Sequence, residues 1–258
     1  MPALTVLIVH HNTTALLRQC LDALRSSPAD VPCEVIVIDN ASPDATVRSL
    51  PRNFPTVRFR FNPRNLGFAR AVNQGVRMGA GRHVLVLNPD TIVRPEDLGK
   101  LTAFMDAHPD AGACGPRLVY PDGNLQLSCR HFPTLLALGL RISRLDRLIR
   151  SPVRHYLMAE WDHSQIRDVD WIIGGCMALR REAIEQIGLL DEGFFMYYED
   201  IDLCYRLCQK GWKVYYNPDV TVVHHHQRTS ASLFPNRLSY MHARSLIRLI
   251  QKHRPALY

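Results

Sequence analysis

Two short stretches hold the residues whose types and spacing suit chemistry. In the first, an aromatic run from Phe194 to Tyr198 ends, where a helix is expected to begin, in three carboxylates: Glu199, Asp200 and Asp202. The free N–H groups and the dipole of a helix N-terminus favour acidic residues and would fix the direction of Asp200. A fixed carboxylate beside aromatic walls suits removal of a proton from a bound hydroxyl, although simple helix capping explains the same residues.

The second stretch lies more than a hundred residues upstream and favours catalysis over capping. Asn88 and Asp90 follow the apolar run His83–Leu87, which reads as a strand. If this strand end and the start of the later helix line one cleft, Asp90 and Asp200 face the same ligand. Glu199 is adjacent to Asp200 and is therefore expected to point elsewhere, in a supporting or acceptor-binding role.

The elements that must position these residues alternate along the N-terminal half. Apolar runs predict strands, and the amphipathic stretches between them predict helices, over these ranges: strands Leu4–Val9, Glu34–Ile38, Arg58–Phe61 and His83–Leu87; helices Thr14–Ser26 and Phe68–Met78. This alternation predicts an α/β fold with a mainly parallel central sheet flanked by helices. Ligands bind such sheets beyond the carboxyl ends of the strands, which selects three polar clusters: His10–Asn12, Asp39–Asn40 and Asn88–Asp90.

Composition limits the class of protein. With 258 residues, of which 47% are hydrophobic and 21% charged, the chain is expected to form one large domain, or one domain with an appendage. No run approaches the ~20 apolar residues of a membrane span, so we expect a cytoplasmic protein, in solution or bound peripherally to a membrane. Seven cysteines without paired spacing fit reduced thiols.

The common nucleotide-binding motifs are missing. Gly79 and Gly81 precede a strand, the reverse of the dinucleotide-binding order, and no phosphate loop ending in Gly-Lys-Ser/Thr occurs. The loop 62–67 leads into a helix that carries Arg70, whose guanidinium can hold a diphosphate beside the helix N-terminus. A loop rich in Asn, Pro and Gly is also an ordinary turn.

Five motifs in order resemble glycosyltransferase family 2, particularly its bacterial rhamnosyltransferase-like branch. The motifs are Val35–Ser42, Asn65–Arg70, Leu87–Asp90, Trp171–Cys176 and Tyr198–Asp202, and the resemblance covers roughly residues 3–228. It implies a GT-A (Rossmann-like) fold and an inverting transfer of a sugar from a nucleotide diphosphate donor to a hydroxyl. The expected organisation is a 1–228 domain, with a nucleotide-sugar-binding half (1–120) and an acceptor-binding half (121–228), followed by a C-terminal helical segment (229–258).

The resemblance also implies roles for residues of the nucleotide half. Asp39 matches the Asp that contacts the base, His11 and Arg70 match positions that touch the nucleotide and its phosphates, and Asn88 belongs to the same donor site. Asp90 matches the last carboxylate of a metal-binding Asp-X-Asp signature, whose first position is Asn88 here. Fewer anionic ligands weaken binding of Mg2+ or Mn2+, which leaves Asp90, diphosphate oxygens, water and a histidine as the shell.

Roles in the acceptor half are more open. His224 matches a position where some relatives supply a metal-binding histidine, with His225 and His226 as alternatives and a plain polar loop as another explanation. Trp171 can offer an apolar face to a sugar ring, and Gly175 can let the backbone approach a ligand. A core tryptophan followed by a tight turn explains these two residues equally well.

The distribution of basic residues indicates which partners the protein contacts. The net charge is +7, and the arginines gather in two amphipathic stretches, 134–154 and the C-terminal stretch with Arg244, Arg248 and Lys252. Either stretch is a solvated helix or a surface that contacts an anionic membrane. Together they favour transient membrane contact over nucleic-acid binding.

The resulting hypothesis is a metal-assisted inverting hexosyltransferase at the inner face of the cell membrane, acting in surface polysaccharide synthesis. Its partners are a dTDP- or UDP-sugar donor, with rhamnose or another deoxysugar favoured, and a glycan or lipid-linked acceptor. Asp200 is the expected general base. The alternatives are a sugar nucleotidyltransferase, and a non-catalytic basic membrane or nucleic-acid adaptor on a nucleotide-binding fold.

Overall fold

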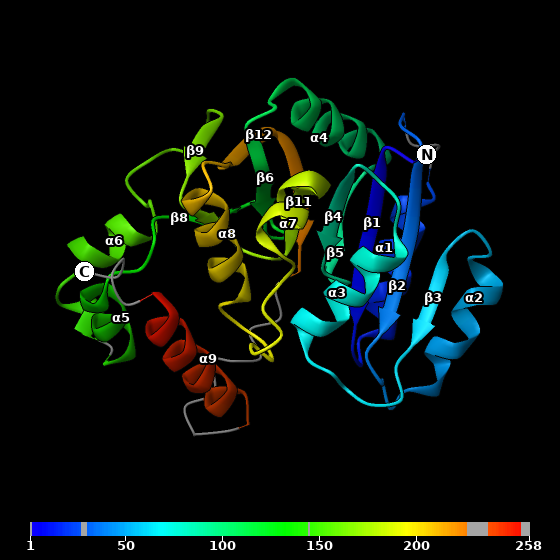
Figure 1. Cartoon of the computed structure of the whole chain (residues 1–258), viewed down its shortest axis with the longest axis horizontal. Helices are drawn as coiled ribbons and strands as arrows, with labels where there is room; N and C mark the ends of the chain where they lie inside the picture. Colours follow the sequence, from blue (N-terminus) through cyan, green and yellow to red (C-terminus); the bar gives the residue numbers. More distant parts are fainter. Residues whose placement is uncertain (1, 27–29, 144, 226–236, 254–258) are drawn as a thin grey trace.

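The computed structural model describes residues 2–26, 30–143, 145–225 and 237–253, and Figure 1 shows a central sheet surrounded by helices. The first four long strands are parallel neighbours: β1 (Leu4–His10), β2 (Cys33–Asp39), β3 (Arg58–Phe61) and β4 (His83–Leu87). In the described chain the main sheet has the order β3-β2-β1-β4-β11-β6-β12-β5. The α/β fold with a mainly parallel sheet, predicted from the sequence, is confirmed.

The second half of the sheet adds one antiparallel strand to its middle. β11 (Cys176–Arg180) runs antiparallel to β4 and to β6 (Ala111–Val119), while β12 (Lys213–His224) is parallel to β6. Short strands complete the edges: β5 (Thr91–Ile92), β7 (Leu125–Gln126) and β9 (Arg167–Val169) in the main sheet, and β8 (Cys129–Arg130) with β10 (Trp171–Ile172) as a separate pair. Strands from before and after residue 120, the expected boundary between the two halves, therefore belong to one sheet.

Helices cover both faces of the sheet because its strands are apolar on both sides. Every residue of β1 is buried. One core contains residues of α3 (Phe68–Met78), α7 (Arg181–Ile187) and α8 (Glu199–Gln209). The other contains residues of α1 (Thr14–Leu24), α2 (Leu50–Asn53) and α4 (Pro95–Ala107).

The strand register brings the polar ends of the first strands to one edge. His10 of β1 is the partner of Asp39 in β2, and Ile8 of β1 is the partner of Leu87 in β4. The residues that follow β1, β2 and β4 therefore lie together, as the parallel order requires.

Two elements differ from the sequence prediction, and a third is described only in part. The stretch 134–154 is not one amphipathic helix but α5 (Leu135–Ile142), the 3-10 turn η2 (Leu145–Arg147) and α6 (Ser151–Tyr156). The acidic helix α8 begins at Glu199, so its carboxylates lie in the first turn and the capping position belongs to Tyr198. Within the predicted C-terminal segment, α9 (Arg237–His253) is helical, and residues 229–236 and 254–258 lie outside the described part.

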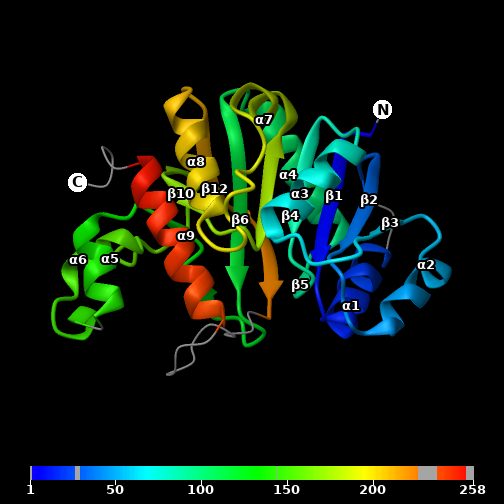
Figure 2. The same cartoon turned by 60° about the horizontal axis from the view of Figure 1, so that its bottom comes forward.

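The helix α9 lies between α8 on one side and the pair α5 and α6 on the other (Figures 1 and 2). Among the described residues, no helix is both long enough and apolar enough to cross a membrane.

Candidate active site

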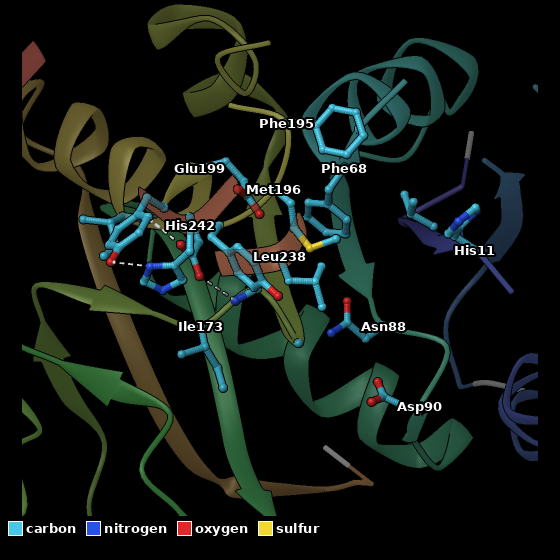
Figure 3. A pocket seen from close by; sticks show the side chains of 18 of the residues that line it. His11, Phe68, Asn88, Asp90, Ile173, Phe195, Met196, Glu199, Leu238 and His242 are labelled. Atoms are coloured by element: carbon cyan, nitrogen blue, oxygen red, sulfur yellow. Dashed lines mark hydrogen bonds between the residues drawn. The ribbon is translucent and has the colours of Figure 1, made fainter. Parts of the chain in front are cut away.

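A cavity of about 980 Å³ opens beyond the carboxyl ends of β1 and β4. His11, Asn88 and Asp90 line one side of it, and Glu199 lines another (Figure 3). Asp200 also lines the cavity. The residues that the sequence placed in two distant stretches therefore meet in one cavity, where a ligand can lie between them.

Asp90 faces the imidazole of His224, whose orientation is fixed by hydrogen bonds to Gln126. The Nε2 atom of His224 lies 3.4 Å from Oδ1 of Asp90. The amide nitrogen of Gln126 donates to the carbonyl of His224 at 2.7 Å, which leaves the amide oxygen to accept from Nδ1 of His224 at 2.9 Å. With Nδ1 directed at Gln126, Nε2 is the ring nitrogen that faces Asp90 and the cavity.

This pair suits a divalent cation. Metal-bound histidines usually donate their second ring N–H to an oxygen, as His224 does to Gln126. No cluster of three or more His, Cys, Asp or Glu suited to a metal occurs within the described ranges. His225 contributes its backbone N–H to the carbonyl of Asp90 at 2.9 Å, and His226 lies outside the described residues.

Gly175 lies against the imidazole of His224. A Cβ at this position would lie 3.2 Å from Cε1 of His224, closer than most side-chain contacts allow. The carbonyl of Gly175 accepts the backbone N–H of Asn88 at 2.9 Å, so the glycine also joins β11 to the end of β4. Gly175 thus lines the cavity chiefly by making room for the histidine.

A strained turn delivers the carboxylates of α8. Tyr197 and Tyr198 adopt φ values of 70° and 67°, which non-glycine residues seldom adopt in succession. Asp200 then accepts hydrogen bonds from the backbone N–H of Gly174 at 3.2 Å and of Ile201 at 2.9 Å. Burial raises the pKa of Asp200 above its ordinary value, and these donors offset part of that effect.

Glu199 also lines the cavity, contrary to the expectation that it points elsewhere. Its side chain reaches a small apolar pocket that Phe68 and Leu203 help to form. It is only 7% exposed, and in the described chain its Oε2 has no hydrogen-bond partner. Burial, and then the charge of Asp200, raise the pKa of Glu199, so this carboxyl favours its protonated form.

Asp202 has a different role from the simple reinforcement of the helix start that the sequence suggested. Its fully buried carboxylate contacts Arg206 of its own helix at 2.9 Å. It also contacts Lys252 at 2.6 Å and His253 at 2.8 Å, both of α9. Because Leu238 and His242 of α9 line the cavity, Asp202 helps to hold one of its walls in place.

The predicted nucleotide contacts are divided between the cavity and its surroundings. His11 lines the cavity, and its Nδ1 lies 3.1 Å from the carbonyl of Asn40. Asp39 lies behind this wall, 3% exposed, with its Oδ1 3.0 Å from Nδ1 of His10 and 2.5 Å from the hydroxyl of Ser42. Burial alone would raise the pKa of Asp39, but these hydrogen bonds overcome that effect and lower it.

The structure does not bring Arg70 into the cavity. Its guanidinium is half-exposed and pairs with Glu192 at 3.2 Å, because that carboxylate lies beside α3. Asn65 and Gly67 of the loop before α3 line the cavity instead. The Asn-rich loop noted in the sequence therefore reaches the site through its own residues.

Residues after position 121 supply an aromatic and cationic wall of the cavity, and Trp171 is one of the residues there that the sequence indicated. Its indole is 3% exposed and donates to the carbonyl of His131 at 2.9 Å. Sequence reasoning missed these further lining residues: Arg130, Tyr156 and His242. It placed Arg141 only within the basic stretch 134–154, and Tyr198 only in the aromatic run before the acidic helix. No motif marks Arg130, Arg141, Tyr156 and His242, because they come from four separate elements.

Comparisons with known proteins show the family of the chain. The family model described as glycosyl transferase family 2 matches residues 5–188. The chain is 33% identical, over 97% of its length and 85% of the other protein, to the N-acetylglucosaminyl-diphospho-decaprenol L-rhamnosyltransferase of Mycobacterium tuberculosis. It is 24% identical, over 79% of its length and 64% of the other protein, to the dTDP-rhamnosyl transferase RfbF of Shigella flexneri.

A solved structure supports the fold. The crystal structure of GalNAc-T7 with UDP, GalNAc and Mn2+ superimposes with a TM-score of 0.71 at 16% identity, covering 97% of this chain and 48% of the other.

Proposed function

The chain belongs to glycosyl transferase family 2 and has the GT-A fold, and from this premise we propose that it transfers rhamnose or another deoxysugar from a dTDP donor to a hydroxyl of a lipid-linked glycan. One observation carries the proposal. Asp90 with His224 and Asp200 line the same cavity, so a leaving diphosphate and an attacking hydroxyl have separate places in it.

Asp200 acts as the general base in this proposal. An ordinary Asp has a pKa near ~4, far below that of a sugar hydroxyl, so the proton leaves late, while the bond to the anomeric carbon forms. The raised pKa of Asp200 narrows that gap and improves it as a proton acceptor. Its two backbone donors hold the carboxylate still, and attack opposite the leaving group inverts the anomeric centre.

The metal is Mg2+ or Mn2+, and Asp90 and His224 are the residues that would hold it. A carboxylate oxygen and an imidazole nitrogen form a donor set that suits Mn2+ and, more weakly, Mg2+. When bound, the ion supplies positive charge to the departing nucleoside diphosphate. Asn88, which follows β4 beside Asp90, binds the donor by its side-chain amide.

The nucleotide lies along the wall that His11, Asn65 and Gly67 form. Asp39 holds this wall through His10 and Ser42, so its effect on the base of the nucleotide is indirect in this arrangement. For Arg70 to reach the diphosphate, its guanidinium must exchange Glu192 for the phosphate oxygens.

The test is a donor screen in which nucleoside diphosphate release is measured with Mg2+, Mn2+ or EDTA. We expect dTDP-rhamnose to be turned over only when a divalent cation and an acceptor are both present. The anomeric configuration of the product, read by NMR, should be opposite to that of the donor. Retention of configuration, undiminished turnover in EDTA, or turnover of no nucleotide sugar would each refute the corresponding part of the proposal.

A further inference from the structure

Two arginines, Arg130 and Arg141, line the cavity. Arg130 and Arg141 form no ion pair with any acid in the described part of the chain. Both lie over one ring, because the Arg130 guanidinium is 5.7 Å and that of Arg141 5.5 Å from the centre of Tyr156. Two cations that share one aromatic ring repel each other, so the arrangement favours an anion between them.

The contacts of Arg130 leave hydrogen-bonding capacity unused. Its guanidinium lies 5.1 Å from the centre of the Trp171 ring. Among the described residues it donates two long hydrogen bonds, to the hydroxyl of Tyr156 and to the carbonyl of Leu127, both of 3.5 Å, and its buried Nε has no hydrogen-bond partner. A planar guanidinium held in this way matches the oxygens of a phosphate group.

This cationic wall is separate from the proposed metal pair. Arg130 belongs to β8 and Arg141 to α5, and both Figures 1 and 2 show α5 across α9 and α8 from β1 and β4, whose ends carry the donor side. Arg130 is nevertheless near enough to lower the pKa of Asp200. The site therefore borders the proposed base on the side away from Asp90.

The surface beyond the arginines is apolar. Leu138 of α5 lines the cavity, while the outer side of the same segment exposes five large hydrophobic side chains: Leu135, Leu136, Leu145, Leu148 and Ile149. Leu148 is 82% exposed and Leu136 is 61% exposed. The segment that contributes Arg141 and Leu138 to the cavity therefore also exposes several large apolar side chains to solvent.

We propose that Arg130 and Arg141 bind the diphosphate of an isoprenoid-diphosphate-linked saccharide, and that its isoprenoid chain lies on the exposed leucines of α5 and η2. The inference rests on the proposed function, because it places the acceptor sugar between these arginines and Asp200. Charge complementarity selects the diphosphate, and the adjoining apolar surface selects the lipid-linked form over a free anion. A neutral glycan would use neither feature.

The experiment measures binding of farnesyl diphosphate in a non-ionic detergent, with EDTA present so that no divalent cation bridges the ligand to Asp90. Farnesol and inorganic pyrophosphate are the two reference ligands. The variants are Arg141→Ala, Arg130→Lys and the matched control Arg147→Ala, which removes the same charge from η2, outside the cavity lining. Nucleotide-sugar binding and the melting temperature are recorded for each variant.

We expect the wild type to bind farnesyl diphosphate more tightly than either reference ligand. Loss of one charge-assisted hydrogen-bond donor should weaken this binding at least about tenfold in Arg141→Ala. Arg130→Lys should weaken it as well, because lysine keeps the charge but loses the planar fork. Arg147→Ala should match the wild type, and donor binding should be unchanged in every variant.

Three results would overturn the inference: equal binding of farnesol, equal binding of pyrophosphate, or unchanged farnesyl diphosphate binding in both Arg141→Ala and Arg130→Lys. Failure of the proposed function gives a different result, because the wild type would then bind no nucleotide sugar whatever the farnesyl diphosphate measurement shows. If Arg130→Lys does not fold, the exposed Arg141 still decides the question.

Discussion

Replacement of Asp200 by asparagine tests its role as a base separately from its contribution to the stability of the fold. Asparagine keeps the shape of the side chain and one oxygen, which can accept from either Ile201 or Gly174 but not from both in the same way. The lost hydrogen bond costs about 1 kcal/mol, a modest part of the stability of a domain. Folding and donor binding should therefore survive the change.

Asp200→Asn should affect turnover more than it affects stability. A positioned general base contributes about 100-fold to 10,000-fold, which corresponds to about 3–5 kcal/mol in the activation free energy. Because Asp200 already has two backbone donors that hold it in place, its contribution should lie within this range, and we expect kcat to fall about 1,000-fold in Asp200→Asn. The KM for the donor should change less than about threefold, since the carboxylate does not act on the donor in the ground state.

The assay follows nucleoside diphosphate release with and without acceptor, beside calorimetric binding of the donor. Glu199→Gln is the matched control, because it removes the neighbouring carboxylate from the same cavity. The wild type should lose kcat as the pH falls through the raised pKa of Asp200, and this acidic limb should be absent from the residual activity of Asp200→Asn. Wild-type turnover in Asp200→Asn, together with a large loss in Glu199→Gln, would refute the assignment of the base to Asp200.

Four further predictions follow from the contacts around the cavity. Gln126→Leu should weaken Mn2+ binding about 10-fold to 100-fold, measured by titration calorimetry with a bound nucleoside diphosphate, because His224 loses the acceptor that orients it. Gly175→Ala should also weaken Mn2+ binding, because the new Cβ displaces the same imidazole, and unchanged affinity would show that the ring has room to move. Asp202→Asn should lower the free energy of unfolding in urea by about 3–5 kcal/mol at pH 7, because it breaks a buried ion pair with α9, and the difference from wild type should shrink at acidic pH, where the carboxylate becomes protonated. Glu199→Gln should become more stable relative to the wild type as the pH rises from 5 to 8. Because the pKa of Glu199 is raised in the folded state, its protonated carboxyl stabilises the wild type fully below the pKa of Glu in the unfolded chain, and this stabilisation is lost as the pH rises. A difference in the free energy of unfolding that does not change with pH would contradict this.

The fold was predictable because its first half repeats a simple pattern. Strand β4 and helix α3 have the bounds that the apolar periodicity of the sequence predicts, since burial on both faces leaves little choice of register. The stretch 134–154 was less predictable. Its leucines and arginines have helical spacing, yet the chain breaks into α5, η2 and α6, and Ser151 and Pro152 start a new helix at its third piece.

The site was predictable where strand ends or helix starts fix a residue. Asp90 and Asp200 lie in one cavity because each directly adjoins a regular element. Arg70 shows the limit of this reasoning, because the sequence does not reveal that Glu192, far away in the chain, lies beside it. Arg130 and Tyr156 were invisible for a related reason: only the folded chain brings β8 and α6 to the same wall.

The first turn of α8 shows how one helix separates three carboxylates by environment. Successive residues of an α-helix point about 100° apart, so Glu199, Asp200 and Asp202 cannot share surroundings. In the described chain, Oε2 of Glu199 has no hydrogen-bond partner and its carboxyl is held as an acid, while Asp200 accepts from two backbone N–H groups and remains a proton acceptor. Asp202 turns away to Lys252 and stays ionised. Because Asp202 pairs with Lys252, the helix α9, which contributes His242 to the cavity wall, is attached to α8 two residues from the proposed base.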